Sequence, residues 1–214
     1  MGINLPGKEQ NDNCFSSPLP VKPTFSVLYN PKYKHLLNLA LEELQRFVGT
    51  FDLVSKIFHF EHLENYYGSE MGYPLYRFYI SAERFITPDP CAEYHSNNCY
   101  KGEKLLSPVS LKLLCQSLEE RFTPFRGKRV INIDPGFIDR NHLFLTTHKE
   151  RGGRVYLGRG IYLEMEYLFF AGEFKPLFWT YKDYRDERVK RFFEKVRKQY
   201  LKGLKQFFPK GLNG

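Results

Sequence analysis

The chain has 214 residues, of which 42% are hydrophobic and 17% aromatic. This composition supports a folded core and excludes a largely disordered chain, and no apolar run reaches the roughly 18 to 20 residues of a membrane-spanning helix. The net charge of +8 is uneven, because ten basic and four acidic residues fall between Lys182 and Lys205. The first residues lack a secretory signal, so we expect a cytoplasmic protein with no membrane anchor.

Residues 1–23 are polar and rich in Pro, Gly, Asn and Ser, which predicts a flexible leader. An apolar run then predicts a strand over 24–29, and Asn30-Pro31 predicts the start of a helix that Gly49 ends. Alternating apolar residues predict two further strands over 51–60 and 74–82.

A second helix is predicted to begin at Ser107-Pro108, and the next strand is expected over 129–133. The resulting order of strand, helix, strand, strand, helix and strand is the split βαβ plan of ferredoxin-like folds. We therefore expect an α+β protein whose ferredoxin-like part covers about 24–136.

Residues 137–208 are predicted to extend this part by an antiparallel β meander and a final helix. Strands are expected over 142–148, 153–157 and 160–170, with turns at Gly152-Gly153 and Gly158-Arg159-Gly160. The final helix, 185–208, is basic and amphipathic; its apolar stripe consists of Val189, Phe192, Phe193, Val196, Tyr200 and Leu204. We expect residues 24–208 to form one domain.

The four cysteines show no CxxC pair. Cys91, His95 and Cys99 have the spacing of metal ligands on a helix, but the prolines before them and Asn97-Asn98 between them predict a loop. A structural zinc site also needs a fourth ligand, which is not evident. We expect no metal site here, and reduced thiols that form a Cys91–Cys99 disulfide under oxidising conditions.

Five motifs lie between about Lys22 and Tyr200: Tyr66-Tyr67 with Glu70-Met71-Gly72, Asn132–Gly136, Thr146–Lys149, Val155–Glu164 and Pro176–Tyr184. In combination they resemble domain-of-unknown-function family 4416. The resemblance implies no established activity. The chain departs from the family pattern at Leu63-Glu64-Asn65, where a Thr usually precedes the Tyr pair, and at Gly153, where a His is common, so no mechanism is expected from a His at that position.

The segment Asp134-Pro135-Gly136 ends an apolar run and has two interpretations. Asp134 is a candidate catalytic carboxylate at a strand end, or the three residues form a tight turn in which Asp bonds its own backbone. We favour the turn. Arg159 lies between two glycines in a predicted hairpin turn, where its guanidinium is a candidate ligand for phosphate or carboxylate.

Glu164 and Glu166 stand two apart on a predicted strand, so both face the same side. They are candidates for an acid–base pair or a divalent-metal site, and we assign Glu164 a catalytic role. The alternative, which we favour for the pair, is a half-exposed strand with Met165 and Tyr167 inside and the two carboxylates in solvent.

A polar set precedes this strand. Thr146 and Thr147 are candidate ligand-binding residues and His148 a candidate acid–base residue. A two-histidine phosphoesterase is excluded because His142 and His148 do not form two His-x-Thr motifs. The sequence also contains neither a GxxxxGK[ST] nor a GxGxxG loop, which excludes classical P-loop and dinucleotide binding.

Four further residues are assigned to ligand binding: Arg154, which would hold an anion, and Tyr66, Tyr67 and Glu70. The two tyrosines are expected in a loop, where they would stack on a ring, although core packing of one of them is the simpler interpretation. Tyr181 is a candidate pocket residue, whereas Trp179 is expected to hold the last helix to the sheet.

Two functions follow from these patterns. The first is a binder of, or an enzyme acting on, a small anionic and possibly phosphorylated ligand, with no particular cofactor indicated. The second is an RNA- or partner-binding accessory protein that uses the basic helix, residues 185–205, although such a basic face is usually only solvated. We favour the first; the oligomeric state is left open.

Overall fold

The computed structural model describes residues 18–61, 64–90, 99–100, 103–104, 106–124 and 127–207. Its strands are β1 (Lys22–Tyr29), β2 (Phe51–Val54), β3 (Phe58–His59), β4 (Tyr76–Ala82), β5 (Cys99–Tyr100), β6 (Glu103–Lys104), β7 (Ile131–Ile138), β8 (His142–Thr147), β9 (Val155–Gly158), β10 (Ile161–Phe170) and β11 (Glu173–Pro176). Its helices are α1 (Lys34–Val48), α2 (Glu64–Met71), α3 (Pro108–Arg121) and α4 (Glu187–Phe207), with single 3-10 turns η1 (Pro31–Tyr33) and η2 (Lys182–Arg185).

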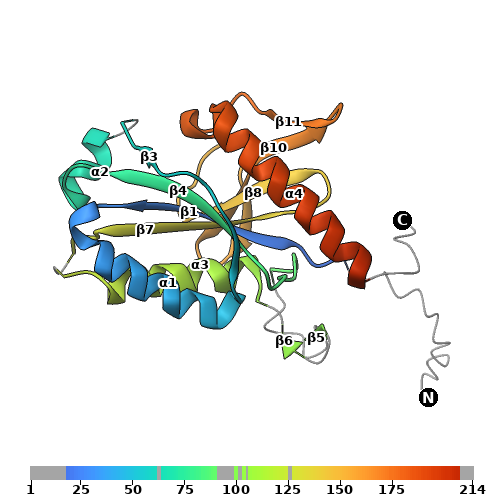
Figure 1. The fold of residues 1–214 in the computed structure, drawn as a ribbon, viewed down its shortest axis with the longest axis horizontal. Helices are drawn as coiled ribbons and strands as arrows, with labels where there is room; N and C mark the ends of the chain where they lie inside the picture. The colour runs from blue at the N-terminus through green and yellow to red at the C-terminus, as the bar shows by residue number, and fades with distance from the viewer. Residues whose placement is uncertain are drawn as a thin grey trace, which may run out of the picture.

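Nine of the described strands form one antiparallel sheet. Its order is β11-β10-β8-β7-β1-β4-β2, with β3 paired to β4 and β9 to β10, while β5 and β6 pair separately. The helices α1 and α3 lie side by side on one face, and the long helix α4 crosses the other face over β8 and β10 (Figure 1). The expected α+β class and the final amphipathic helix are confirmed. The C-terminal strands are antiparallel as expected, but they are not a simple meander, because β8 pairs with β10 and β9 lies on the other side of β10.

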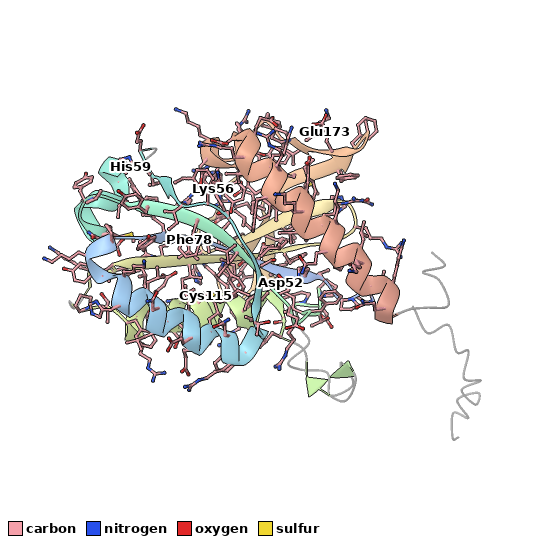
Figure 2. The ribbon with its side chains drawn as sticks, viewed as in Figure 1. Asp52, Lys56, His59, Phe78, Cys115 and Glu173 are labelled. Carbon is pink, nitrogen blue, oxygen red and sulfur yellow. The ribbon has the colours of Figure 1, made fainter. Side chains whose placement is uncertain are left out.

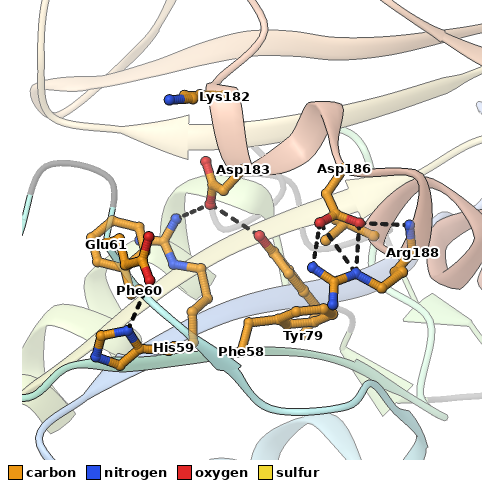
Figure 3. Close-up of a pocket in the computed structure, with 11 residues that line it drawn as sticks. Phe58, His59, Phe60, Glu61, Tyr79, Lys182, Asp183, Asp186 and Arg188 are labelled. Atoms are coloured by element: carbon orange, nitrogen blue, oxygen red, sulfur yellow. Dashed lines mark hydrogen bonds and ion pairs between the residues drawn. The ribbon is translucent and has the colours of Figure 1, made fainter.

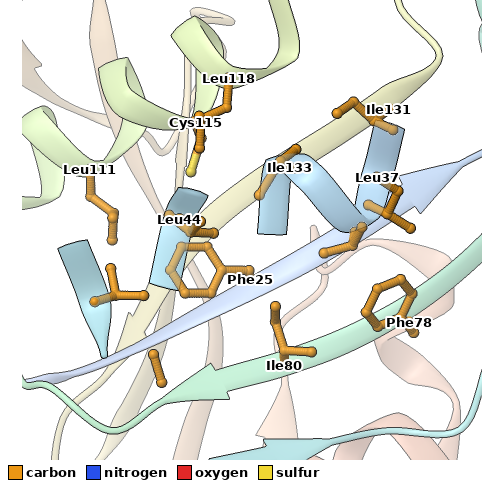
Figure 4. Packing of buried hydrophobic residues seen from close by; sticks show 14 of the residues in the cluster. Phe25, Leu37, Leu44, Phe78, Ile80, Leu111, Cys115, Leu118, Ile131 and Ile133 are labelled. Atoms are coloured by element: carbon orange, nitrogen blue, oxygen red, sulfur yellow. The ribbon is translucent and has the colours of Figure 1, made fainter. Parts of the chain in front are cut away.

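The core on the α1/α3 face is apolar because alternate residues of the central strands point to it. Phe25, Ile80 and Ile133 of β1, β4 and β7 pack against Leu44 of α1 and Cys115 of α3 (Figure 4). Full burial of one such aliphatic or aromatic side chain contributes about 1.5–3 kcal/mol. This layer fixes β7 and α3 relative to each other, and both supply charged residues to the site described below.

The core on the opposite face is largely aromatic. The stripe of α4 predicted from the sequence is buried there, with Phe193 stacked on Tyr184 and edge-on to Tyr79 and Tyr167. Trp179 donates a hydrogen bond from Nε1 to the carbonyl of Met165 at 2.7 Å, which attaches the segment before η2 to β10. The apolar side of α4 is therefore fully used in packing.

The start of the chain is structured earlier than predicted. β1 begins at Lys22, whose side chain is buried and paired with Asp52 at 2.5 Å, and Val21 forms an isolated bridge with Ile86. Residues 19–23 of the expected flexible leader therefore pack on the domain. The rest of that leader, residues 1–17, lies outside the described residues.

Two other regions differ from the predictions. Residues 51–60 form two short strands, β2 and β3, instead of one, and residues 64–71 form the helix α2 instead of a loop. The sequence Glu64–Met71 has no apolar helical stripe and contains Gly68 and two tyrosines, so its local pattern does not favour a helix. The strand β11 was also not expected.

Asp134-Pro135-Gly136 is not a turn: β7 runs straight through it from Ile131 to Ile138. The ladder between β7 and β8 covers only Gly136 to Ile138, so no strand of the described residues pairs with the first half of β7 on that side. There the backbone N–H of Ile133 donates to Glu119 Oε1 at 2.6 Å, and the carbonyl of Pro135 accepts from Thr146 Oγ1 at 2.8 Å. Because no described strand pairs with this side, position 135 does not need a backbone N–H for the sheet. Proline, which has no N–H, is therefore tolerated there.

Gly136 stands at the point where β8 first meets β7, and its lack of a side chain is required there. A Cβ at this position would lie 2.1 Å from the carbonyl oxygen of Phe144, which is backbone and cannot move aside cheaply. We therefore expect Gly136→Ala to destabilise the protein by about 3 kcal/mol, at the upper end for overpacking, measured by urea unfolding. Gly152→Ala, where a Cβ would meet no atom within 4 Å, is the control; equal stabilities of the two variants would contradict this account.

The cysteine-rich segment is mostly beyond what the structure describes. Residues 91–98 and the side chain of Cys99 lie outside the described residues, so the expected Cys91–Cys99 disulfide and the loop around them stay predictions. Cys115 is buried between α3 and the sheet (Figure 2). No helix in the described part of the chain is long and apolar enough to cross a membrane.

Candidate functional site

The strands β7 and β8 separate at Gly136, and a cavity of about 250 Å³ lies beside this separation. We call it the split cavity. It is lined by Ser26, Phe60, Tyr66, Tyr67, Arg77, Lys112, Arg129, Asn132, Asp134, Leu145, Thr146, Thr147, His148, Lys149, Glu164, Tyr181, Asp183 and Tyr184. Residues from β1, α2, β4, α3, β7, β8 and β10 thus meet at one place.

Asp134 lies among the lining residues with both carboxylate oxygens bonded. Lys112 Nζ donates to Oδ1 at 2.9 Å and Asn132 Nδ2 donates to Oδ2 at 2.7 Å. Burial alone would raise the pKa of Asp134, but the charge and hydrogen bond of Lys112 outweigh it and lower the pKa to about 2. Asp134 is therefore an anion at neutral pH, and it keeps the buried Lys112 charged.

Arg129 extends this network on the other side of Asn132. Its Nη1 donates to Asn132 Oδ1 at 2.8 Å and to Glu119 Oε2 at 2.9 Å, while Nε and Nη2 bond the two oxygens of Glu70 at 2.7 and 3.0 Å. Glu70, predicted to bind ligand, is absent from the lining set and instead orients Arg129. The charges of Lys112 and Arg129 are thus both balanced by carboxylates.

A second charged group consists of Glu164 of β10 and Arg154, which stands just before β9. Arg154 donates from Nη2 to Glu164 Oε2 at 2.5 Å and to the Tyr181 hydroxyl at 2.8 Å, and its side chain is fully buried. Glu164 and Tyr181 line the split cavity, but Arg154 is not in the lining set. Arg154 therefore acts on the cavity by holding these two residues in place.

The expectation that Glu164 and Glu166 point to solvent is wrong, since their residues are 2% and 0% exposed. Glu164 is covered by the side chain of Arg154, which pairs with it. Glu166 is buried because of a β-bulge in β10: Met165 pairs with Phe144 and Tyr167 with Leu143, which leaves Glu166 as the extra residue. Both Glu166 and Tyr167 consequently turn inward, and the period-two alternation fails here.

Glu166 is held mostly in its protonated form, which is unusual for a carboxyl group at neutral pH. Burial and the neighbouring charge of Glu164 raise the pKa of Glu166 to about 8. Its Oε2 accepts from the backbone N–H of Tyr181 at 3.2 Å, and its buried Oε1 has no partner among the described residues. Glu166 is thus mostly protonated at neutral pH, and it lies behind the lining residue Glu164.

The exposed part of the split cavity carries His148 and Lys149. Lys149 Nζ lies 4.7 Å from the centre of the Tyr66 ring, and no carboxylate of the described residues pairs with it. His148 Nδ1 is 3.1 Å from the carbonyl of Gly160. Since a carbonyl only accepts, Nδ1 carries the hydrogen in this bond and Nε2 is the acceptor.

Tyrosine side chains supply the neutral polar groups of the cavity. Tyr66, 57% exposed, and the half-buried Tyr67 both come from α2, not from the predicted loop. Burial, together with the nearby carboxylate of Asp134, raises the pKa of Tyr67 to about 12. Burial also raises the pKa of Tyr181. Both phenols therefore keep their protons at neutral pH and are available as hydrogen-bond donors.

A second cavity, of about 500 Å³, lies behind one wall of the split cavity. The two share Phe60, Arg77 and Asp183, and Arg77 forms an ion pair with Asp183. Asp183 also accepts a hydrogen bond from the Tyr79 hydroxyl at 3.0 Å (Figure 3). Figure 3 also shows Arg188 of this second cavity paired with Asp186. Its lining holds as many carboxylates as Lys and Arg side chains, namely Glu61, Asp183 and Asp186 with Arg77, Lys182 and Arg188. The lining of the split cavity has one Lys or Arg more than it has carboxylates, so it is the better candidate site for an anion.

The structure brings together most of the residues predicted for the site. Those that line the split cavity are Asp134, Thr146, Thr147, His148, Glu164, Tyr66, Tyr67 and Tyr181. Glu70 and Arg154 do not line the cavity, but Glu70 bonds the lining residue Arg129, and Arg154 bonds the lining residues Glu164 and Tyr181. Arg159 lies in the predicted β9–β10 hairpin turn, with φ +55°, and is not in the lining set; its ligand role stays a prediction.

Four lining cations were missed: Arg77, Lys112, Arg129 and Lys149. A signal existed for Lys112, because Lys112 and Glu119 stand seven apart on α3 next to its buried stripe of Leu111, Cys115 and Leu118. A charged pair two turns apart beside an apolar face indicates a buried ion pair or a site. Arg77 sits in an apolar strand and Arg129 before one, with no comparable pattern.

The described residues contain no group of three or more His, Cys, Asp or Glu side chains arranged to hold a metal ion. The cavity instead combines buried ion pairs, tyrosine hydroxyls and, near solvent, one unpaired lysine beside a histidine. This is a donor-rich site of the kind that binds a small polar ligand through hydrogen bonds.

The fold and the cavity define an α+β protein with a polar, cation-containing site at a split in its sheet. The chain belongs to the family described as a domain of unknown function, DUF4416, whose model matches residues 19–200. No curated protein and no solved structure matches the chain.

Proposed function

We propose that the protein binds a small anionic ligand, for example a phosphorylated one, in the split cavity. The observation that carries this proposal is the charge balance of the lining. Arg77, Lys112 and Arg129 are each paired with a carboxylate, whereas Lys149 has no such partner among the described residues and lies beside His148. The positive charge left over at the entrance favours an anion.

The other lining groups suit the same ligand. The protonated hydroxyls of Tyr67 and Tyr181 and the hydroxyl of Thr147 donate hydrogen bonds, and the exposed ring of Tyr66 offers an apolar surface. Asp134, bonded on both oxygens, serves to fix Lys112 and Asn132 and not as a base.

If the protein is an enzyme, His148 is the residue that we propose as its acid–base group. It lies at the exposed side of the cavity, and its Nε2 is available because Nδ1 bonds the Gly160 carbonyl. Glu164, fixed by Arg154, is the carboxylate that would act with it. Arg159 would contact only ligands that extend to the β9–β10 turn.

Lys149→Gln tests the site with little risk to the fold, because Lys149 is exposed and unpaired in the described structure. Loss of a charge-assisted hydrogen bond costs about 1.5–3 kcal/mol, so the Kd for a bound anion should rise about 10- to 100-fold. The probes are pyrophosphate, a sugar phosphate and a nucleoside monophosphate, measured by calorimetry after a thermal-shift screen.

Lys34→Gln is the matched control, since Lys34 is exposed on α1 and absent from the lining set. It should bind the probes as the wild type does. Equal losses of affinity in both variants would show that binding responds only to net charge. If Lys149→Gln left the Kd and the thermal shift of the probes unchanged, the ligand would bind elsewhere.

We further propose that the part from β1 to β7 is ferredoxin-like and that residues 24–208 form one domain located in the cytoplasm. The support for the fold is the spatial order β7-β1-β4-β2, with α1 between β1 and β2 and α3 between β4 and β7 along the chain. Here α2 and β3 are insertions, and α2 supplies the two tyrosines of the cavity.

A further inference from the structure

The exposed face of α4 carries a straight row of cations that is separate from both cavities. Arg191, Lys195, Lys198, Lys202 and Lys205 follow one another at intervals of four, three, four and three residues, and all five are exposed. At 3.6 residues per turn they fall within an arc of about 80°, and at 1.5 Å per residue the row is about 21 Å long. We call this row the α4 stripe.

The charges of the α4 stripe are not neutralised by the rest of the described molecule. Other basic residues of the helix are engaged: Arg188 pairs with Asp186, Lys190 with Glu173 and Glu187, and Arg197 donates to the carbonyl of Arg140. None of the five stripe residues has a carboxylate partner among the described residues. The nearby Glu194 accepts from the backbone N–H of Phe174 at 3.3 Å.

We propose that the α4 stripe binds the phosphodiester backbone of single-stranded nucleic acid such as RNA. A narrow row of fixed cations on a rigid helix is complementary to a linear array of phosphates. Such contacts recognise phosphate and carry no base sequence.

A membrane surface fits this helix less well. Helices that lie on membranes insert their apolar face into the lipid. The apolar face of α4 is buried against the sheet through Val189, Phe192, Phe193, Val196 and Tyr200, so it is not available for insertion. The α4 stripe is therefore complementary to a polyanion that is bound through its charge alone.

The test uses the full chain and fluorescein-labelled single-stranded RNA and DNA of one sequence, long enough to span the stripe, followed by fluorescence anisotropy. Five phosphate contacts predict a slope of log K against log salt of about −3.5, and hence about a 100-fold loss of affinity between about 50 and 200 mM salt. RNA and DNA should bind alike, because the stripe contacts phosphate and not sugar.

The variant Lys198→Gln/Lys202→Gln removes two charges from the middle of the stripe and should make the slope shallower by about 1.4. The control Lys34→Gln/Lys56→Gln removes two exposed lysines from α1 and the β2–β3 connection and should keep the wild-type slope. Circular dichroism checks that all variants fold.

Three results would overturn the proposal: no binding of either oligonucleotide at low salt, equal effects of the two double variants, or binding to phosphatidylserine vesicles without binding to the oligonucleotides. Because Lys149 and the split cavity are untouched in all these variants, anion binding in that cavity is tested independently.

Discussion

Lys112→Met is expected to destabilise the protein by about 1.5–3 kcal/mol, because it leaves the partly buried carboxylate of Asp134 without its cation. Burial disfavours the negative charge of Asp134, and Lys112 and Asn132, together with the charge of Arg77, favour it and lower the pKa of Asp134. Methionine fills the volume of the lysine stem but offers no donor. Urea unfolding at neutral pH measures the loss, with Lys34→Met on the exposed face of α1 as the control.

The double variant Lys112→Met/Asp134→Asn distinguishes the charge from the packing. It removes both members of the ion pair, and Asn132 can still donate to the amide oxygen at position 134. We expect it to recover most of the stability lost in the single variant, because replacing both charges of a buried pair is far less costly than removing one. A double variant as unstable as the single one would show that Lys112 matters through its shape.

Glu166→Gln is expected to change how the stability of the protein depends on pH. The pKa of Glu166 is raised from 4.5 to about 8 in the folded protein, so between these values the folded state holds a proton that the unfolded state has lost. The contribution of Glu166 to the free energy of unfolding therefore falls as pH rises through this window, by about 1.4 kcal/mol per pH unit, or about 4 kcal/mol from pH 5 to pH 8.

Glutamine has the shape of the protonated acid and does not titrate. Glu166→Gln should therefore lack this decline and become more stable than the wild type at pH 8, while differing little at pH 5. Urea unfolding at several pH values between these limits gives the comparison. Glu61→Gln, which removes an exposed carboxylate, should follow the wild-type profile; parallel profiles for all three proteins would refute a buried, protonated Glu166.

Local sequence patterns were sufficient for the elements whose geometry is regular. The apolar stripe of α4 predicted the helix and its buried side, and Gly158-Arg159-Gly160 predicted the hairpin between β9 and β10. The helix α2 was missed because its eight residues show no apolar periodicity, and it is held by what surrounds it: Met71 and Tyr67 pack with Phe60. Tertiary contacts decide such short segments.

The site was found only in part, because it depends on departures from regular structure. The sequence predicts Asp134 as a candidate, but Pro135 and Gly136 predict a turn there. In the structure these two residues permit a strand that pairs with β1 along its whole length, while on its other side it pairs with β8 only from Gly136 onward, where the two backbones approach closely. Glu166 was misplaced for a similar reason, since a bulge cannot be seen in an alternating pattern. The sequence pattern of α3 marks Lys112 as unusual, but it does not identify the partner, Asp134, which lies 22 residues later on β7.

The central position of β1 has a consequence for how the protein is made. Phe25 pairs with Ile80 on one side and with Pro135 on the other, although Pro135 is synthesised 110 residues later. At about 5–20 residues per second, a nascent β1 waits roughly 5 to 20 s for its second neighbour. All eight of its residues are buried in the finished fold, so during translation this strand is an exposed edge that a chaperone would have to shield from other chains.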